Sequence, residues 1–253
     1  MNLLGSLRSE ILKTRRTASY YLTLIAAAAT PFMFLIFVCL DGLSPDDRKD
    51  PLNAIFKRFE MTGMAIFPIF VILICTLMPQ LEYRNNTWKQ VFASPQAKSN
   101  VFIAKLLNIQ LLILAFLVTN YLFMFLVAIV THFIFPELNI LHQPLNWNRV
   151  LLNGVNAYVS LLAVVAIQFW LGLRFKNFIV PIAVGLSLWI AGTLMVVGYY
   201  TSSARYFPYS FPAFSNLPQY RSQLEQVLWT SAGYAVLIFI LAFADFRKIR
   251  MKA

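Results

Sequence analysis

Residues 106–131 read LLNIQLLILAFLVTNYLFMFLVAIVT and contain no charged side chain. An α-helix needs about 20 apolar residues to cross the hydrocarbon core of a bilayer, and a charge at its centre costs at least about 2.5 kcal/mol. This stretch therefore predicts a transmembrane helix. Similar charge-free runs occur at residues 20–40, 61–81, 150–173, 178–198 and 226–244. The sequence predicts an all-α membrane protein with six transmembrane helices.

The composition supports the same fold class. Apolar residues make up 59% of the chain and charged residues 12%, whereas soluble domains average about 45–50% and about 25%. The apolar runs are spread over the whole length, so we expect a single transmembrane domain over residues 1–253. The net charge of +11 does not indicate nucleic-acid binding, because the basic residues flank the runs instead of forming one patch.

The distribution of Lys and Arg predicts the orientation. Of the 21 basic residues, 14 lie on the side that holds both ends of the chain, with three of the ten acidic residues. These basic residues are Arg8, Lys13, Arg15, Arg16, Arg84, Lys89, Lys98, Lys105, Arg174, Lys176, Arg247, Lys248, Arg250 and Lys252. The other side carries seven basic and seven acidic residues, so its net charge is zero. Cytoplasmic loops carry the excess of Lys and Arg, which predicts cytoplasmic N- and C-termini.

Two segments outside the runs have helical patterns. In residues 1–18, Leu4, Leu7 and Ile11 recur at helical spacing, which predicts an amphipathic helix in the membrane interface; the alternative is a plain cytoplasmic start of the first span. In the linker 82–105, Asn85 or Asn86 can cap a two-turn helix that ends before Pro95. Its side bearing Trp88, Val91 and Phe92 needs either a groove in a protein partner or the membrane interface.

The segment 199–225, on the predicted outer side, is rich in aromatic residues and proline. A freely solvated loop would be more polar, so we expect a re-entrant segment or a lid over the spans. As a surface it suits either an amphipathic molecule or simple packing at the interface.

The polar residues inside the runs are Asn108, Gln110, Asn120, Asn153, Asn156 and Gln168. Interhelical hydrogen bonding is the default role for such residues, and Asn120, Asn156 and Gln168 are candidates for a substrate path. Pro31, Pro68 and Pro181 also lie inside runs, where neighbouring helices can satisfy the carbonyls that proline leaves free.

The chemistry that the sequence lacks narrows the function. No Asp, Glu, Lys, Arg or His lies within a run, which disfavours ion-coupled carriers. There is no H-E-x-x-H motif and no nucleophile elbow, so we expect no catalysis and no cofactor in this chain. There is also no G-x-x-x-x-G-K-[ST] loop, so any ATP that drives the protein must bind to another polypeptide.

Several motifs resemble those of type-two ABC exporter permeases. They are SEILK at 9–13, Glu82 with NTWK at 86–89, Ser94-Pro95, and AKLL at 104–107. Asn86 stands where that family often has glycine, which changes the expected helix cap. The stretch FPYSFP at 207–212 resembles the small permeases of lantibiotic immunity and bacitracin resistance.

The resemblance implies a permease in a bacterial plasma membrane that exports a hydrophobic or amphipathic substrate, such as an antimicrobial peptide, a drug or a lipid. It implies two permease halves, as a homodimer or a heterodimer, with two ATPase subunits that hold ATP and Mg²⁺. The linker helix becomes the coupling helix, whose ATPase contacts would be Glu82, Thr87, Trp88, Lys89, Val91 and Phe92. The rival hypothesis is a stand-alone channel, carrier or scaffold, for which no Walker-A protein would be encoded beside this chain.

Overall fold

A computed structural model describes residues 3–15, 17–85, 87–88 and 96–248, and every regular element in this part is helical. Six helical spans are long and apolar enough to cross a membrane, as the sequence predicts. They are built on the helices α2 (Ala18–Asp41), α5 (Phe67–Arg84), α7 (Lys98–Ile134), α8 (Trp147–Arg174), α9 (Ile179–Val197) and α11 (Leu224–Lys248).

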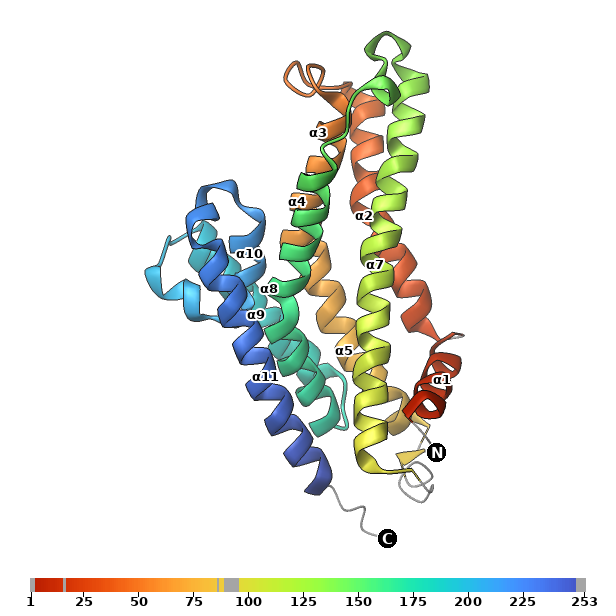
Figure 1. Cartoon of the computed structure of the whole chain (residues 1–253), viewed down its shortest axis with the longest axis vertical. Helices are drawn as coiled ribbons and strands as arrows, with labels where there is room; N and C mark the ends of the chain where they lie inside the picture. The colour runs from red at the N-terminus through yellow and green to blue at the C-terminus, as the bar shows by residue number, and fades with distance from the viewer. Residues whose placement is uncertain (1–2, 16, 86, 89–95, 249–253) are drawn as a thin grey trace.

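The second span, Pro51–Arg84, is composite and lies at the centre of the bundle. It consists of α3 (Pro51–Lys57), α4 (Phe59–Met61), a π-helical turn η1 (Thr62–Ile66) and α5. It is the most buried span, with 61% of its apolar window inside the protein. Figure 1 shows α2 and α7 on one side of α5, with α8, α9 and α11 on the other.

Neighbouring helices satisfy two carbonyls that proline leaves free. Pro31 cannot donate to the carbonyl of Ala27, and Asn120 of α7 donates its Nδ2–H to that oxygen at 2.7 Å. Pro68 likewise cannot donate to Met64, whose carbonyl accepts from the indole N–H of Trp189 on α9 at 3.3 Å. The expectation that adjacent helices compensate for these prolines is confirmed at both positions.

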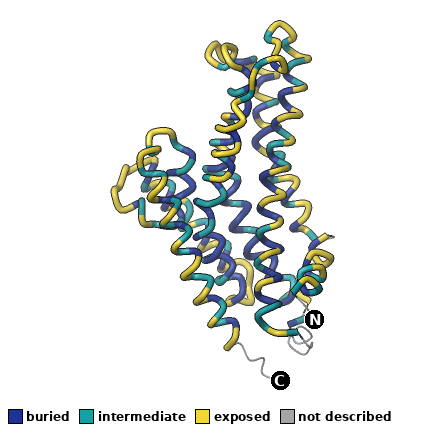
Figure 2. The backbone as a smooth tube through the Cα atoms, viewed as in Figure 1, coloured by how far each residue is buried: buried dark blue, intermediate teal, exposed yellow. Residues whose placement is uncertain are grey.

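The two ends of the described chain lie at the same end of the bundle (Figure 1). The short helix α1 (Leu3–Thr14) and the last turn of α11 are found there, together with the connections α5–α7 and α8–α9. Figure 2 shows that the outward sides of the long helices are exposed along most of their length. Many of these exposed side chains are apolar, for example Ile36, Leu122 and Ile240, as expected where lipid is the solvent.

Helix α1 packs its polar side inward. Ser6, Glu10 and Thr14 are buried, and the helix contacts α7. Leu4 and Leu12 are 78% and 59% exposed. The predicted helix in residues 1–18 is therefore present and amphipathic, with its apolar side left free. Its location in the membrane interface stays a prediction.

The aromatic segment before the last span is folded onto the bundle. It forms η4 (Ser202–Tyr206), η5 (Pro208–Ser210), α10 (Phe211–Asn216) and η6 (Pro218–Gln223), and Figure 1 places α10 beside the middle of α8. Gly192 of α9 allows a close approach of the two backbones, because a Cβ there would lie 2.6 Å from the carbonyl carbon of Tyr209. The segment is packed against the spans, and its insertion into the bilayer stays a prediction.

Candidate functional site

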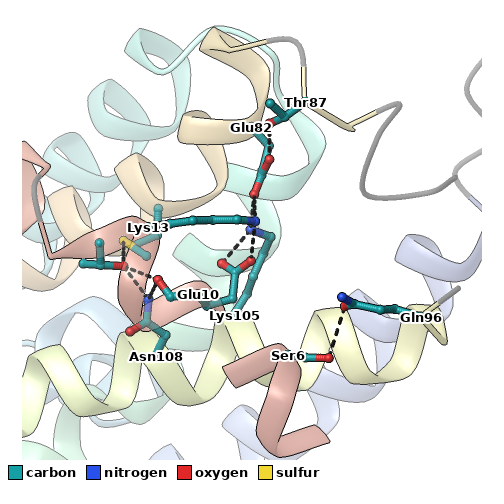
Figure 3. Close-up of polar contacts among 10 residues, drawn as sticks. Ser6, Glu10, Lys13, Glu82, Thr87, Gln96, Lys105 and Asn108 are labelled. Carbon is teal, nitrogen blue, oxygen red and sulfur yellow. Dashed lines mark hydrogen bonds and ion pairs between the residues drawn. The ribbon is translucent and has the colours of Figure 1, made fainter. Parts of the chain in front are cut away.

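Four charged side chains from three helices meet at the end of the bundle where the chain begins. We call Glu10, Lys13, Glu82 and Lys105 the ion cluster (Figure 3). The Lys105 ammonium lies 2.8 Å from Glu10 and 3.0 Å from Glu82. The Lys13 ammonium lies 2.9 Å from Glu10 and 2.8 Å from Glu82. Each lysine therefore bridges both glutamates, and the cluster ties α1, α5 and α7 together.

Three of the four side chains of the ion cluster are buried, and its two lysines balance its two glutamates. The side chains of Lys105, Glu82 and Glu10 are 2%, 3% and 7% exposed, and that of Lys13 is 40% exposed. Burial lowers the pKa of Lys13, but hydrogen bonds and charges from Glu82 and Glu10 outweigh it, so this pKa is raised. Lys13 is therefore charged at neutral pH. An unpaired buried charge is costly, so removing a buried member of the cluster should destabilise the protein.

Polar contacts fasten both ends of the α5–α7 connection to the helices that carry the ion cluster. Thr87, which follows α5, donates its hydroxyl to the Glu82 carboxylate. Gln96, which precedes α7, accepts a hydrogen bond from Ser6 of α1 at 3.1 Å. Asn108 of α7 donates to the Thr14 hydroxyl at 2.7 Å. The connection is thus fastened at its start and at its end to the same group of helices (Figure 3).

Trp88 lies inside the protein, whereas the sequence predicts it on an exposed aromatic side. Trp88 is 3% exposed, and its ring lies 5.4 Å from that of Tyr83 and 6.0 Å from that of Phe246 on α11. The Lys105 ammonium lies 5.5 Å from the ring centroid. A large aromatic side chain buried between α5, α7 and α11 removes apolar area from water, which explains the inward position.

The other predicted contacts of the coupling helix divide into three groups. Glu82 belongs to the buried ion cluster, and Thr87 is half-buried beside it. Lys89, Val91 and Phe92 lie outside the described residues. The fold of the permease alone does not test contacts with an ATPase, so the role of these residues in binding one stays a prediction.

The base of the connection is also fastened to the second half of the bundle. Gln80 and Tyr83 of α5 donate hydrogen bonds of 2.7 Å to the carbonyls of Phe175 and Leu173, at the end of α8. Arg174 of α8 pairs with Asp245 of α11 at 3.2 Å. A displacement of the connection would therefore act on both halves of the bundle.

The three candidates for a substrate path lie apart. Asn120 is buried and donates to Ala27, which gives it a structural role. Gln168 is also buried, and its amide donates to the Tyr209 hydroxyl at 2.8 Å. Asn156 lines an open polar cleft. A shared path for the three stays a prediction.

Sequence reasoning did not anticipate the ion cluster. It had treated Glu82 and Lys105 as linker residues and Lys13 as part of an interfacial helix. Two features of the sequence could have indicated the cluster. Glu10 and Lys13 are spaced at i, i+3, and single charges, Glu82 and Lys105, lie at the ends of two successive spans. What could not be read from the sequence was that these three places meet.

Comparison with known proteins assigns the family. The chain matches the model of the ABC-2 family transporter protein over residues 6–192, which is most of its length and includes the whole ion cluster. No protein with a curated description matches the sequence. Together with six helices able to cross a membrane, the match shows that the chain belongs to the ABC-2 transporter family, as a multi-pass, non-catalytic membrane permease of the kind that works with ATPase subunits.

Proposed function

We propose that this chain is the permease of an ATP-driven exporter in a bacterial plasma membrane, with both termini in the cytoplasm. Separate ATPase subunits hold ATP and Mg²⁺, and the cargo is hydrophobic or amphipathic. One observation carries the proposal: the ion cluster joins α1, α5 and α7 at the base of the α5–α7 connection, whose first part is bonded to it through Thr87.

The connection is suited to transmit movement from a cytoplasmic partner. Its start is held by Thr87 and Trp88, and its end by Gln96. A push on the segment between them would reach α1 and α7 through the ion cluster. It would reach α8 and α11 through Tyr83 and Trp88, which contact those helices.

This arrangement divides the proposed ATPase contacts into two roles. Glu82 and Trp88 anchor the connection from inside the permease, since both are almost fully buried. Lys89, Val91 and Phe92, with Thr87 beside them, would contact the ATPase. Because the connection is anchored in this way, an ATPase that pushes on it would move the attached helices.

The assembly and the subgroup are further parts of the proposal. Two copies of this single permease domain, or one copy with a related permease, would pair with two ATPases, and the cargo would pass between the halves. The stretch 207–212 supports the subgroup of lantibiotic-immunity and bacitracin-resistance permeases by resemblance. The direction of transport rests on resemblance to exporters.

The test uses the ATPase encoded beside this chain. Phe92→Asp should abolish co-purification of the two proteins, because it places a carboxylate on the expected apolar contact. Leu141→Asp is the matched control at the opposite end of the bundle, where Leu141 is 39% exposed in the η3 turn (Ile140–His142), and it should leave the complex intact. An unchanged complex with Phe92→Asp argues against the coupling helix, and the absence of any neighbouring ATPase favours a stand-alone channel or carrier.

A further inference from the structure

A polar cleft opens between the first half of α8 and the aromatic segment before the last span. Its volume is about 610 Å³, which lies in the usual range of small-molecule sites, about 300–1,000 Å³. Its lining is Glu60, Asn146, Asn148, Arg149, Leu152, Asn153, Asn156, Phe214, Ser215, Asn216, Leu217, Pro218, Arg221 and Leu224. Five asparagines and three charged residues gather here, in a chain with only 12% charged residues.

The position of Asn153 and Asn156 along α8 places the cleft at the depth of lipid headgroups. Asn156 precedes Arg174, at the other end of α8, by 18 residues, which is about 27 Å of helix. The hydrocarbon core is about 30 Å thick. If Arg174 marks one boundary, Asn153 and Asn156 lie at the opposite one. The orientation that makes this boundary the outer leaflet rests on the proposed function.

The cleft offers polar groups that the protein itself does not use. The side-chain amides of Asn148, Asn153 and Asn156 form no hydrogen bond with the part of the chain that the structure describes. Within the same part, Arg221 forms no ion pair. Arg149 has one long contact, at 3.4 Å, with Glu60. Half-buried amides on the floor and guanidinium groups at the rim are thus available to a ligand.

The lining combines two kinds of chemistry. Guanidinium groups bind phosphate through paired hydrogen bonds and are the preferred side chain for that purpose. Leu152, Phe214 and Leu224 add apolar surface to the same cleft, and Leu152 is 51% exposed beside Val155 on the outward side of α8. A ligand that matches both has a phosphate group attached to an apolar body.

We propose that this cleft binds the phosphate-bearing headgroup of a membrane amphiphile. Arg149 and Arg221 hold the phosphate at the rim, the amides of Asn153 and Asn156 bind ester or hydroxyl oxygens below it, and the acyl part lies along Leu152 and the outward surface of α8. Binding is independent of transport. That the bound amphiphile is also the cargo rests on the proposed function.

The test measures lipid binding to the full chain purified in detergent, by native mass spectrometry. The probes are phosphatidylglycerol, free glycerol phosphate, and diacylglycerol as the analogue without phosphate. Arg149→Gln combined with Arg221→Gln should weaken phosphatidylglycerol binding about tenfold, as expected for lost charge-assisted bonds in an open cleft. Arg205→Gln is the matched control. It removes a cation from the same segment outside the lining, where Arg205 bonds to the Ser202 carbonyl and lies over Tyr206.

Each outcome bears on the proposal. Selective loss in the double variant, with phosphatidylglycerol bound far more tightly than either other probe, supports it. Equal binding of diacylglycerol overturns the phosphate assignment, and equal binding of glycerol phosphate assigns the cleft to a soluble anion instead. An equal loss of phosphatidylglycerol binding in Arg205→Gln would mean that net charge explains the effect, and it would also overturn the site. A second double variant, Asn153→Leu with Asn156→Leu, keeps both arginines and should weaken phosphatidylglycerol binding. Unchanged binding would overturn the role of these two asparagines. No arm involves an ATPase, so this site and the proposed coupling helix succeed or fail separately.

Discussion

Replacing Lys105 by methionine should destabilise the protein more than any other single change in the ion cluster. The Lys105 ammonium bridges Glu10 and Glu82 and is 2% exposed on its side chain. Methionine preserves most of the volume but leaves two buried carboxylates with only Lys13, which is 40% exposed. Breaking a buried ion pair in this way costs about 3–5 kcal/mol.

The chain supplies its own reporter for this loss. Cys75 of α5 is fully buried, whereas Cys39 of α2 is exposed. In a Cys39→Ser background, a thiol-reactive dye labels Cys75 only after the core opens. Since each 1.4 kcal/mol is a factor of ten, Lys105→Met should accelerate labelling about 10²- to 10³-fold.

Two comparison variants make the result specific to charge. Lys13→Met leaves Lys105 in place to bridge both glutamates, so its cost should be near that of an exposed pair, about 1 kcal/mol, or about fivefold in rate. Adding Glu82→Gln to Lys105→Met leaves Glu10 paired with Lys13 and should restore part of the stability, as a double-mutant cycle would measure. If Lys105→Met labels no faster than Lys13→Met, or if the second change adds further damage, the electrostatic account of the ion cluster is refuted.

Four other changes, made in the same Cys39→Ser background, test the fold and the orientation. Asn120→Leu leaves the Ala27 carbonyl without its donor and should cost about 1–3 kcal/mol, seen as faster Cys75 labelling; an unchanged rate would remove the structural role of this amide. Gly192→Ala forces a Cβ against the segment before the last span and should cost about 1–3 kcal/mol in the same assay, unless that segment can shift freely. Trp88→Ala should cost about 3–5 kcal/mol because its ring is buried, and a neutral result would mean that the ring faces outward. Leu141→Cys should react with an impermeant maleimide in intact cells, and protection there would reverse the predicted orientation.

The six spans could be predicted because hydrocarbon excludes charge, and that rule acts on each segment separately. The run at residues 106–131 needs no knowledge of its neighbours to be read as a helix across the membrane. The same holds for carbonyls that lose their donor to proline: the sequence shows that Pro31 leaves the Ala27 carbonyl without a backbone N–H partner. It does not show that Asn120, far along the chain, will be the donor.

The ion cluster could not be predicted, because it depends on which helix ends meet. Glu10 and Lys105 are 95 positions apart, and nothing local links them. For α1, the helix was recognised, but the partners of its polar side were not: Glu10 and Thr14 bond to side chains of α7. Ser6 bonds to Gln96, just before that helix. Trp88 was misplaced for the related reason that an aromatic near a linker can find partners inside as well as outside.

Under the proposed function, a role in movement explains the ion cluster better than a role in stability. Apolar side chains of similar volume would hold three helices together at least as well, since buried ion pairs are often no better than hydrophobic replacements. An apolar contact, however, tolerates sliding, whereas a pair of lysines that each bridge two glutamates defines one relative position of α1, α5 and α7. Under the proposed function, an ATPase displaces the α5–α7 connection, and a cluster that fixes one relative position would make α1, α5 and α7 move together.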